Sequence, residues 1–310
     1  MSKICYLLIF LYLLLPSCGR KAPPQLKIFE KPEKVKDLKA IHNEKGIILS
    51  WSYEGKNQEI KGFVIFRSEG GEYEKRGYIE GREKPAFLDQ DFRPGISYRY
   101  RVIAEGIQGL LSDAAEISVT PANLPKPPGN TRFHIKNDSI ELSWDDNKGC
   151  YNVYRAYNGE EYQPINEKPV CGHTFIDRSI IEKTVHYIIK SLTITDIINE
   201  GQASERISIG PEDYIPSPPT ELVIVVSDNK VFLLWKEPPE SWVKGYRIYR
   251  RSEEEKVFRL IGETSIPGFA DSNLNGLKGK KLYYMIKALG PSTESKPLYG
   301  DCLFSYPEIR

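Results

Sequence analysis

The sequence predicts an all-β fold in which several sandwich domains follow one another along the chain. One strand-like hexapeptide occurs three times, at intervals of 88 and 95 residues: GFVIFR at 62–67, CYNVYR at 150–155 and GYRIYR at 245–250. Before each copy stands an alternating apolar segment that ends in tryptophan: IILSW, IELSW and VFLLW, ending at Trp51, Trp144 and Trp235. A content of 24 Gly, 22 Pro and 19 Tyr favours strands and turns over one large core. Because repetition of this kind is typical of tandem modules, we expect three domains.

The first element along the chain is an apolar leader at residues 1–17. Lys3 is followed by an uncharged apolar run from Ile4 to Leu15. This layout is typical of a secretory signal peptide, and about twelve apolar residues are too few for a membrane-spanning helix, which needs about twenty. We therefore interpret residues 1–17 as a signal peptide.

Cys18 ends this leader in the sequence LPSC, which resembles the lipobox of bacterial lipoproteins, although Pro16 is an unusual residue there. The resemblance implies cleavage before Cys18 and acylation of its thiol and new amino group, and two or more acyl chains hold a protein stably at a membrane. The alternative is cleavage by an ordinary signal peptidase, for which small residues would be expected at the site. In the lipoproteins that this segment resembles, mainly an Asp after the acylated cysteine retains a protein at the inner membrane, so the resemblance and Gly19 imply the outer membrane if the host has two membranes. Residues 18–34, rich in Pro and Lys, are expected to be a lipid-anchored linker.

The repeated units share a second block downstream of each hexapeptide. It consists of an aromatic residue, any residue, an aspartate, a turn and an alternating aromatic strand: FLDQDFRPGISYRYRVIA from Phe87, FIDRSIIEKTVHYIIKS from Phe175 and FADSNLNGLKGKKLYYMIKA from Phe269. The tryptophan strands alternate with period two, as strands with one buried face do, and the inward set is Ile47, Leu49, Trp51, Ile140, Leu142, Trp144, Val231, Leu233 and Trp235.

Together these patterns resemble the fibronectin type III domain over nearly the whole chain beyond about Val35. The resemblance implies three immunoglobulin-like sandwiches of seven strands each, at residues 35–121, 126–211 and 216–310. It also implies a corner hydrogen bond made by the Tyr98 hydroxyl, which we expect to be missing from domains 2 and 3 because Val185 and Leu282 stand at the matching positions. The proline-dense linkers PANLPKPPG and PEDYIPSPPT are expected to be semi-rigid, so the domains should form a rod.

Charge and motifs exclude several functions. The chain has 43 Lys plus Arg and 42 Asp plus Glu, so no net field attracts nucleic acid. Four scattered histidines form no metalloprotease motif, no nucleophile elbow is present, and the glycines form no phosphate-binding loop. The repeated Asp89, Asp177 and Asp271 are better explained by Asx turns than by catalysis. We expect no enzyme activity, no cofactor and no metal.

Cys150 and Cys171 allow three interpretations. With His173 they could bind zinc or copper, they could form a disulfide in an oxidising compartment, or they could be two free thiols. The metal signal is weak because the spacing is irregular. The fibronectin type III resemblance implies that the strand bearing Cys150 and the region after Cys171 belong to different sheets, which disfavours a disulfide, so we favour free thiols. Cys302 has no evident partner.

The remaining candidates for recognition lie on the hexapeptide strands. If Phe63 and Ile65 and their counterparts point inward, the alternating residues point outward, and these include Phe66, Tyr154, Arg247 and Tyr249. The alternative is that each aromatic packs on a neighbouring strand or beneath an arginine stem. Trp242, in the loop PPESWVKG, is a separate candidate for sugar stacking or protein contact, with packing as the alternative.

Two functions remain open at this point. The first is a non-catalytic, lipid-anchored protein of the cell envelope whose rod of modules binds an envelope or extracellular protein or glycan, or holds a place in an envelope assembly. The second is an accessory carbohydrate-binding or spacer lipoprotein that serves an extracellular hydrolase. We favour the first, because no segment is left over for a catalytic domain. The ligand cannot be read from the sequence, since one fold of this kind hosts many unrelated partners.

Overall fold

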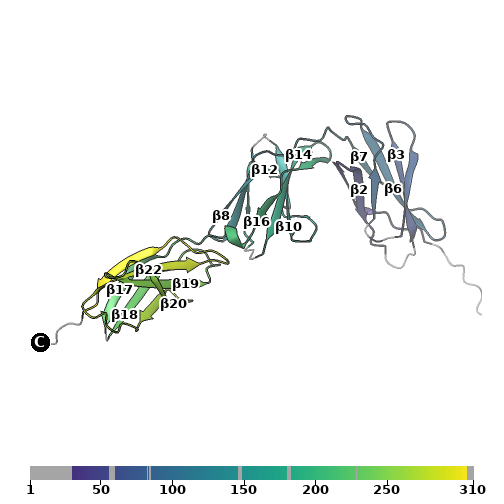
Figure 1. Ribbon diagram of the computed structural model, residues 1–310. Helices are drawn as coiled ribbons and strands as arrows, with labels where there is room; N and C mark the ends of the chain where they lie inside the picture. Colours follow the sequence, from purple (N-terminus) through teal and green to yellow (C-terminus); the bar gives the residue numbers. More distant parts are fainter. Residues whose placement is uncertain are drawn as a thin grey trace, which may run out of the picture.

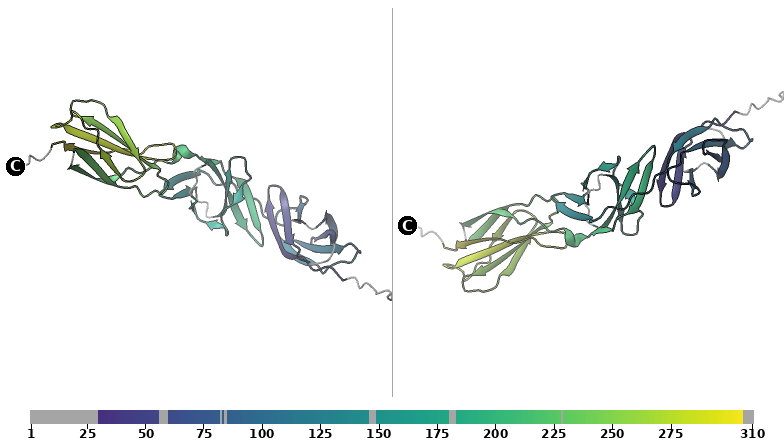
Figure 2. Two further views of the ribbon diagram at one scale, coloured as in Figure 1. Left: turned by 90° about the horizontal axis from the view of Figure 1, so that it is seen from below. Right: turned by 90° about the horizontal axis from the view of Figure 1, so that it is seen from above.

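The computed structural model describes residues 30–55, 60–81, 83, 85–145, 149–179, 183–227 and 229–305. Within these ranges the chain is built from strands, with one short 3₁₀ helix, η1, at Pro211–Asp213. The strands form three sandwiches that lie in a row in all three views (Figures 1 and 2). The all-β, immunoglobulin-like fold is therefore confirmed. The leader and Cys18 lie outside the described residues.

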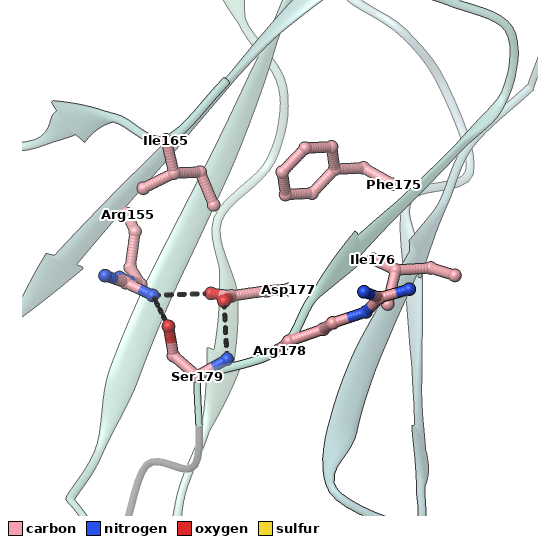
Figure 3. Close-up of a pocket in the computed structure, with 7 residues that line it drawn as sticks. All are labelled: Arg155, Ile165, Phe175, Ile176, Asp177, Arg178 and Ser179. Carbon is pink, nitrogen blue, oxygen red and sulfur yellow. Dashed lines mark hydrogen bonds and ion pairs between the residues drawn. The ribbon is translucent and has the colours of Figure 1, made fainter. Parts of the chain in front are cut away.

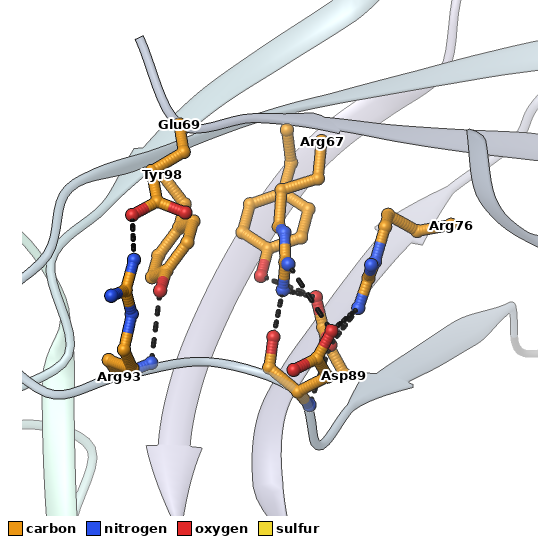
Figure 4. A network of polar contacts seen from close by, with 8 residues as sticks. Arg67, Glu69, Arg76, Asp89, Arg93 and Tyr98 are labelled. Carbon is orange, nitrogen blue, oxygen red and sulfur yellow. Dashed lines mark hydrogen bonds and ion pairs between the residues drawn. The ribbon is translucent and has the colours of Figure 1, made fainter. Parts of the chain in front are cut away.

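Domain 1 packs a three-stranded sheet against a four-stranded sheet, counted over its described residues. The first sheet has the order β1-β2-β5 and the second β4-β3-β6-β7. The strands are β1 (Lys36–Asn43), β2 (Gly46–Ser52), β3 (Ile60–Ser68), β4 (Glu74–Glu80), β5 (Ala86–Asp89), β6 (Tyr98–Gly106) and β7 (Ala115–Val119). The Tyr98 hydroxyl accepts a hydrogen bond from the backbone N–H of Arg93 at 2.9 Å, which confirms the expected corner (Figure 4).

Domain 2 repeats this plan with two of its strands interrupted. Its first sheet has the order β13-β9-β8, and in its second sheet β10 pairs with β14, flanked by two short pieces on either side. The strands are β8 (Arg132–Lys136), β9 (Ser139–Ser143), β10 (Cys150–Tyr157), β11 (Gln163–Pro164), β12 (Val170–Cys171), β13 (Thr174–Asp177), β14 (Val185–Ile194), β15 (Ile198–Ala203) and β16 (Ile207–Ile209).

Domain 3 has the sheets β17-β18-β21 and β20-β19-β22-β23. The strands are β17 (Thr220–Ser227), β18 (Lys230–Lys236), β19 (Gly245–Ser252), β20 (Arg259–Thr264), β21 (Gly268–Asp271), β22 (Lys281–Leu289) and β23 (Leu298–Leu303). In the described part of the chain no helix has the length and apolarity needed to cross a membrane.

Each domain has its own core between its two sheets. The inward residues predicted on the tryptophan strands are all buried, as are the predicted inward residues of the hexapeptide strands. Each tryptophan packs edge-on against the first inward aromatic of the hexapeptide strand, with ring centroids 5.0–5.3 Å apart: Trp51 on Phe63, Trp144 on Tyr151 and Trp235 on Tyr246. Since such rings carry much of the buried apolar surface, the tryptophan is the anchor of each module.

Domains 1 and 2 share a sheet. Strand β15 of domain 2 pairs in parallel with β1 of domain 1, with Ile41 opposite Ile198 and His42 opposite Asn199. The amide oxygen of the fully buried Asn199 accepts hydrogen bonds from His42 Nδ1 at 2.9 Å and from the backbone N–H of Ala122, in the linker, at 2.7 Å. One continuous sheet therefore runs from β5 through β15 to β10.

The linkers are docked against the domains that follow them. A Cβ at Gly201 would lie 2.2 Å from the carbonyl oxygen of Pro125, and a Cβ at Gly290 would lie 2.6 Å from that of Tyr214. Both glycines are therefore needed so that the linker backbone can approach the sheet closely. This close packing, with the prolines, gives the rod its defined joints.

Candidate functional site

The repeated aspartates form a buried polar cluster that bridges the two sheets of each domain; Figure 3 shows it in domain 2 and Figure 4 in domain 1. In every domain the aspartate is the last residue of an edge strand of the three-stranded sheet. It accepts hydrogen bonds from an arginine that lies near the end of the hexapeptide strand and from a tyrosine on the sixth strand of the domain. The members are Asp89, Arg67 and Tyr100, then Asp177, Arg155 and Tyr187, then Asp271, Arg250 and Tyr284.

The cluster has the same geometry in all three domains. The arginine-to-carboxylate distances are 2.6–2.7 Å and the tyrosine-to-carboxylate distances 2.8–2.9 Å. Each aspartate also accepts the backbone N–H two residues further on, at 2.9–3.2 Å. This is the local backbone hydrogen bond expected for an Asx turn, so the structural interpretation of the aspartates is supported.

Electrostatics in the cluster favour a fixed structural role. Burial, followed by the nearby carboxylate, raises the pKa of Tyr100, Tyr187 and Tyr284. Burial alone would raise the pKa of Asp177, but hydrogen bonds from Ser179, Tyr187 and Arg155 bring it below its usual value. The Asp177 carboxylate is thus held ionised, and both of its oxygens already accept hydrogen bonds from within the domain. Sequence reasoning missed the arginines and tyrosines, although the shared final Arg of the hexapeptides was a visible signal.

Cys150 and Cys171 form a disulfide, with their Cα atoms 4.0 Å apart. The preference for free thiols was therefore wrong. Strand β12 turns back onto β10, so the two cysteines lie directly opposite each other in one sheet rather than in two. The free cysteine among the described residues, Cys302, is half-buried on β23, and burial raises its pKa to about 11. No three His, Cys, Asp or Glu side chains gather as metal ligands in the described ranges.

Two of the predicted outward aromatics are tied to a glutamate on the adjacent hairpin. In domain 2 the hydroxyl of Tyr154 donates to Glu200, which is almost fully buried and also accepts from Lys190 Nζ at 3.1 Å. In domain 3 the hydroxyl of Tyr249 lies 3.4 Å from Glu294. Phe66 has the equivalent place in domain 1 without a hydroxyl, and it is half-buried. The packing alternative is therefore correct in part, because each of these three aromatic side chains is partly covered by its own domain.

The outer face of the four-stranded sheet of domain 3 carries a mixed group of aromatic and charged side chains. Tyr249 on β19 lies opposite Met285 on β22, which lies opposite Tyr299 on β23. Arg247 donates to Glu263 at 2.7 Å and to Glu294 at 2.6 Å, which fixes its guanidinium beside this row. Tyr299 is 60% exposed, so one end of the row is open to a partner.

A shallow depression of about 380 Å³ lies beside this row. Arg251 stacks on Tyr283 at 4.0 Å and on Phe258 at 5.3 Å, and Phe258 contacts Tyr299 with centroids 6.0 Å apart. We call this surface, made by Tyr249, Met285, Tyr299, Arg251, Tyr283 and Phe258, the domain 3 aromatic face. Sequence reasoning found Tyr249 of this face and the neighbouring Arg247 but missed the other five members, although the alternation in LYYMIK was a usable signal.

Trp242 lies in the joint between domains 2 and 3, away from the aromatic face. Its indole N–H donates to the backbone carbonyl of Asn137 at 2.9 Å, and its ring packs edge-on against Tyr214 of the linker at 5.4 Å. Only 6% of its surface is exposed. The backbone N–H of Ser241 beside it donates to Asp138 at 2.8 Å. The structure thus places Trp242 in a packed joint, which is the packing alternative, and leaves no open ring for a sugar.

Comparisons with known proteins add limited information. No protein-family model matches the sequence. A 178-residue stretch, 54% of this chain, is 24% identical to Protein sidekick of Drosophila melanogaster and covers 8% of that protein, so the chain spans a small fraction of the length of this relative.

Similar solved structures include domains FN1–FN3 of chicken CNTN1, at 17% identity over 89% of this chain and 100% of that chain, with a TM-score of 0.30. A two-domain fibronectin type III segment of chicken tenascin is 13% identical over 57% of this chain and 99% of that chain, and the chicken interferon gamma receptor alpha chain is 12% identical over 59% and 100%, both with a TM-score of 0.43. At these scores the fold assignment rests on the strand pairing of the chain itself.

Proposed function

We propose that the chain is a non-catalytic, lipid-anchored protein of the cell envelope that presents three sandwich domains as a rod and binds a protein partner through the domain 3 aromatic face. The observation that carries the proposal is the row of Tyr249, Met285 and Tyr299 beside Arg251. Tyrosine and arginine contribute most to protein interfaces when a partner removes them from water.

A protein fits this face better than a glycan. Sugar stacking needs the open face of an aromatic ring, whereas Arg251 covers Tyr283 at 4.0 Å and Lys287 approaches the Tyr249 ring at 5.9 Å. These rings and cations lie together over three neighbouring strands, β19, β22 and β23, which suits the extended contact of a protein partner.

The rod and its anchor give this face its position. The three domains lie in a row, with domain 3 at the end opposite domain 1 (Figures 1 and 2). A lipid on Cys18, which precedes domain 1, would hold the rod by its domain 1 end and present domain 3 away from the membrane. The proposal thus includes a lipid on Cys18 and a location in the cell envelope, which is the outer membrane if the host has two membranes.

Capture of partners from native envelope extract tests the binding surface. We expect Tyr299→Ala to reduce capture of the specific partner at least about fivefold, which corresponds to about 1 kcal/mol. Because Tyr299 is mostly exposed, the substitution should leave the fold unchanged. Leu88→Ala, an exposed apolar change on the three-stranded sheet of domain 1, is the matched control. Equal capture by the wild type and Tyr299→Ala would place recognition elsewhere.

A further inference from the structure

A second surface of domain 3 is apolar where the equivalent outward positions on the first two strands of domain 2 are polar. The outward residues of β17 and β18 are Val223, Val225, Phe232 and Leu234, with exposures of 53%, 46%, 37% and 53%. The strand register places Val223 opposite Leu234 and Val225 opposite Phe232, and Phe232 lies opposite the exposed Ala270 of β21. These five residues form one contiguous patch, which we call the β17–β18 face.

The fold does not require this patch. The residue pair that precedes the core tryptophan is Lys39 and Ser50 in domain 1, Arg132 and Ser143 in domain 2, and Val223 and Leu234 in domain 3. The next outward pair in domain 2 is His134 and Glu141, where domain 3 has Val225 and Phe232. Since the same strand positions are charged or polar in domain 2, the apolar set in domain 3 needs an explanation outside its own core.

We propose that the β17–β18 face is the contact between two copies of this chain. The patch lies on one sheet, and two sheets in a sandwich pack face to face about 10 Å apart, which is the arrangement that each domain already uses internally. A two-fold axis through the patch would place the same residues of both copies against each other, as in most dimers of identical chains.

Charge at the rim suits a second copy. Glu221 and Lys236 lie at one end of the face and form an ion pair at 3.0 Å, and Lys230 lies at the other end. The rim therefore carries both positive and negative charges. It produces no strong electrostatic field that would attract an oppositely charged partner or repel an identical copy.

The area available predicts a weak, reversible dimer. With about half of each large side chain exposed, the patch offers on the order of 300–400 Å² per copy, a size at which apolar patches are often functional. Two copies with their rims then approach the lower end of specific interfaces, about 1,200 Å² in total.

Cross-linking of the full chain in the cells that express it tests this contact. All variants carry Cys302→Ser to remove the free thiol, and Val225→Cys places a thiol at the centre of the face. His134→Cys is the matched control, because His134 is exposed at the equivalent strand position in domain 2. With a short bismaleimide we expect Val225→Cys to give at least about five times more product of twice the chain mass than His134→Cys.

Added substitutions decide whether the face itself holds the copies together. Phe232→Glu with Leu234→Ser introduces the residues that domain 2 carries at these positions, Glu141 and Ser143, and we expect the cross-linked yield of Val225→Cys to fall at least about fivefold. Leu234→Ser alone, matching Ser50 in domain 1, is the milder variant if the double substitution impairs folding. Both are checked by circular dichroism.

The other outcomes overturn the proposal. Equal yields for Val225→Cys and His134→Cys would indicate random collision. A product of another mass would identify a different protein on the face, and a thiol that reacts only once, with no cross-link, would show that no second copy covers it. These results are independent of the domain 3 aromatic face, because that face lies on the other sheet of the sandwich.

Discussion

Removal of the Asp177 carboxylate should destabilise domain 2 strongly. The carboxylate accepts hydrogen bonds from Arg155 at 2.7 Å, from the Tyr187 hydroxyl at 2.8 Å and from the Ser179 N–H at 2.9 Å. Asp177→Ala leaves a mostly buried guanidinium and a buried hydroxyl without this acceptor. Breaking a buried ion pair costs about 3–5 kcal/mol. Because Arg155 keeps its hydrogen bond to Ser179 Oγ and is 21% exposed, we expect about 2–4 kcal/mol.

Tyr187→Phe isolates a single hydrogen bond of the same cluster. It removes the hydroxyl and leaves the ion pair intact, so the expected loss is about 1–2 kcal/mol. Asp301→Ala is the control, because Asp301 forms an ion pair with Lys281 in which both side chains are nearly half exposed, and such pairs contribute little. The assay is urea titration of the full chain with hydrogen-exchange mass spectrometry of β14, which reports on domain 2, and of β22, which reports on domain 3 and hence on the control.

The pH dependence of the cluster provides a further check. The pKa of Asp177 in the folded chain lies below its ordinary unfolded value of about 3.9. The ionised group therefore contributes stability above pH 3.9, and that contribution is lost as the pH falls through the folded pKa. Wild-type domain 2 should lose protection of β14 below about pH 4, and Asp177→Asn should lose less over the same range. If Asp177→Ala and Tyr187→Phe each cost less than Asp301→Ala, the cluster does not hold the two sheets together.

The other predictions concern the disulfide, the anchor and the second joint. Reduction of Cys150–Cys171, which are 21 residues apart, should lower the stability of domain 2 by about 3 kcal/mol, measured by urea titration with and without reductant; an unchanged midpoint would contradict this. Cys18→Ser should move the chain from the membrane fraction to the soluble fraction or leave its leader uncut, and wild-type fractionation and migration would refute the lipid anchor. Trp242→Ala should loosen the joint between domains 2 and 3 and broaden the distance distribution from small-angle scattering, whereas a distribution like that of the wild type would show that the linker alone sets the angle.

The fold was predictable because its signals are local and repeated. Period-two alternation around each tryptophan follows directly from the pleat of a strand with one buried face, and three copies exclude coincidence. The inward assignments of Ile65, Val153 and Ile248 were therefore correct.

The environment of the candidate sites was less predictable because it depends on contacts between distant strands. Nothing in the residues around Tyr154 shows that Glu200, 46 positions later, lies within reach of its hydroxyl. Cys150 and Cys171 were misjudged because the interrupted strand of domain 2 bends β12 back onto β10, which alternation does not encode. Trp242 has the sequence context of an exposed loop, and only the packing of domain 3 against Asn137 buries it.

Because β15 of domain 2 pairs in parallel with β1 of domain 1, these two domains cannot be exchanged or removed independently of each other. Without domain 1, the β15 hairpin would present bare backbone N–H and C=O groups together with the fully buried Asn199, and such an edge readily pairs with another chain. Fragments that begin at domain 2 should therefore aggregate, whereas fragments that end after domain 2 should stay soluble. Domain 2 should therefore be expressed together with domain 1, and an insertion in the linker between them would separate two halves of one sheet.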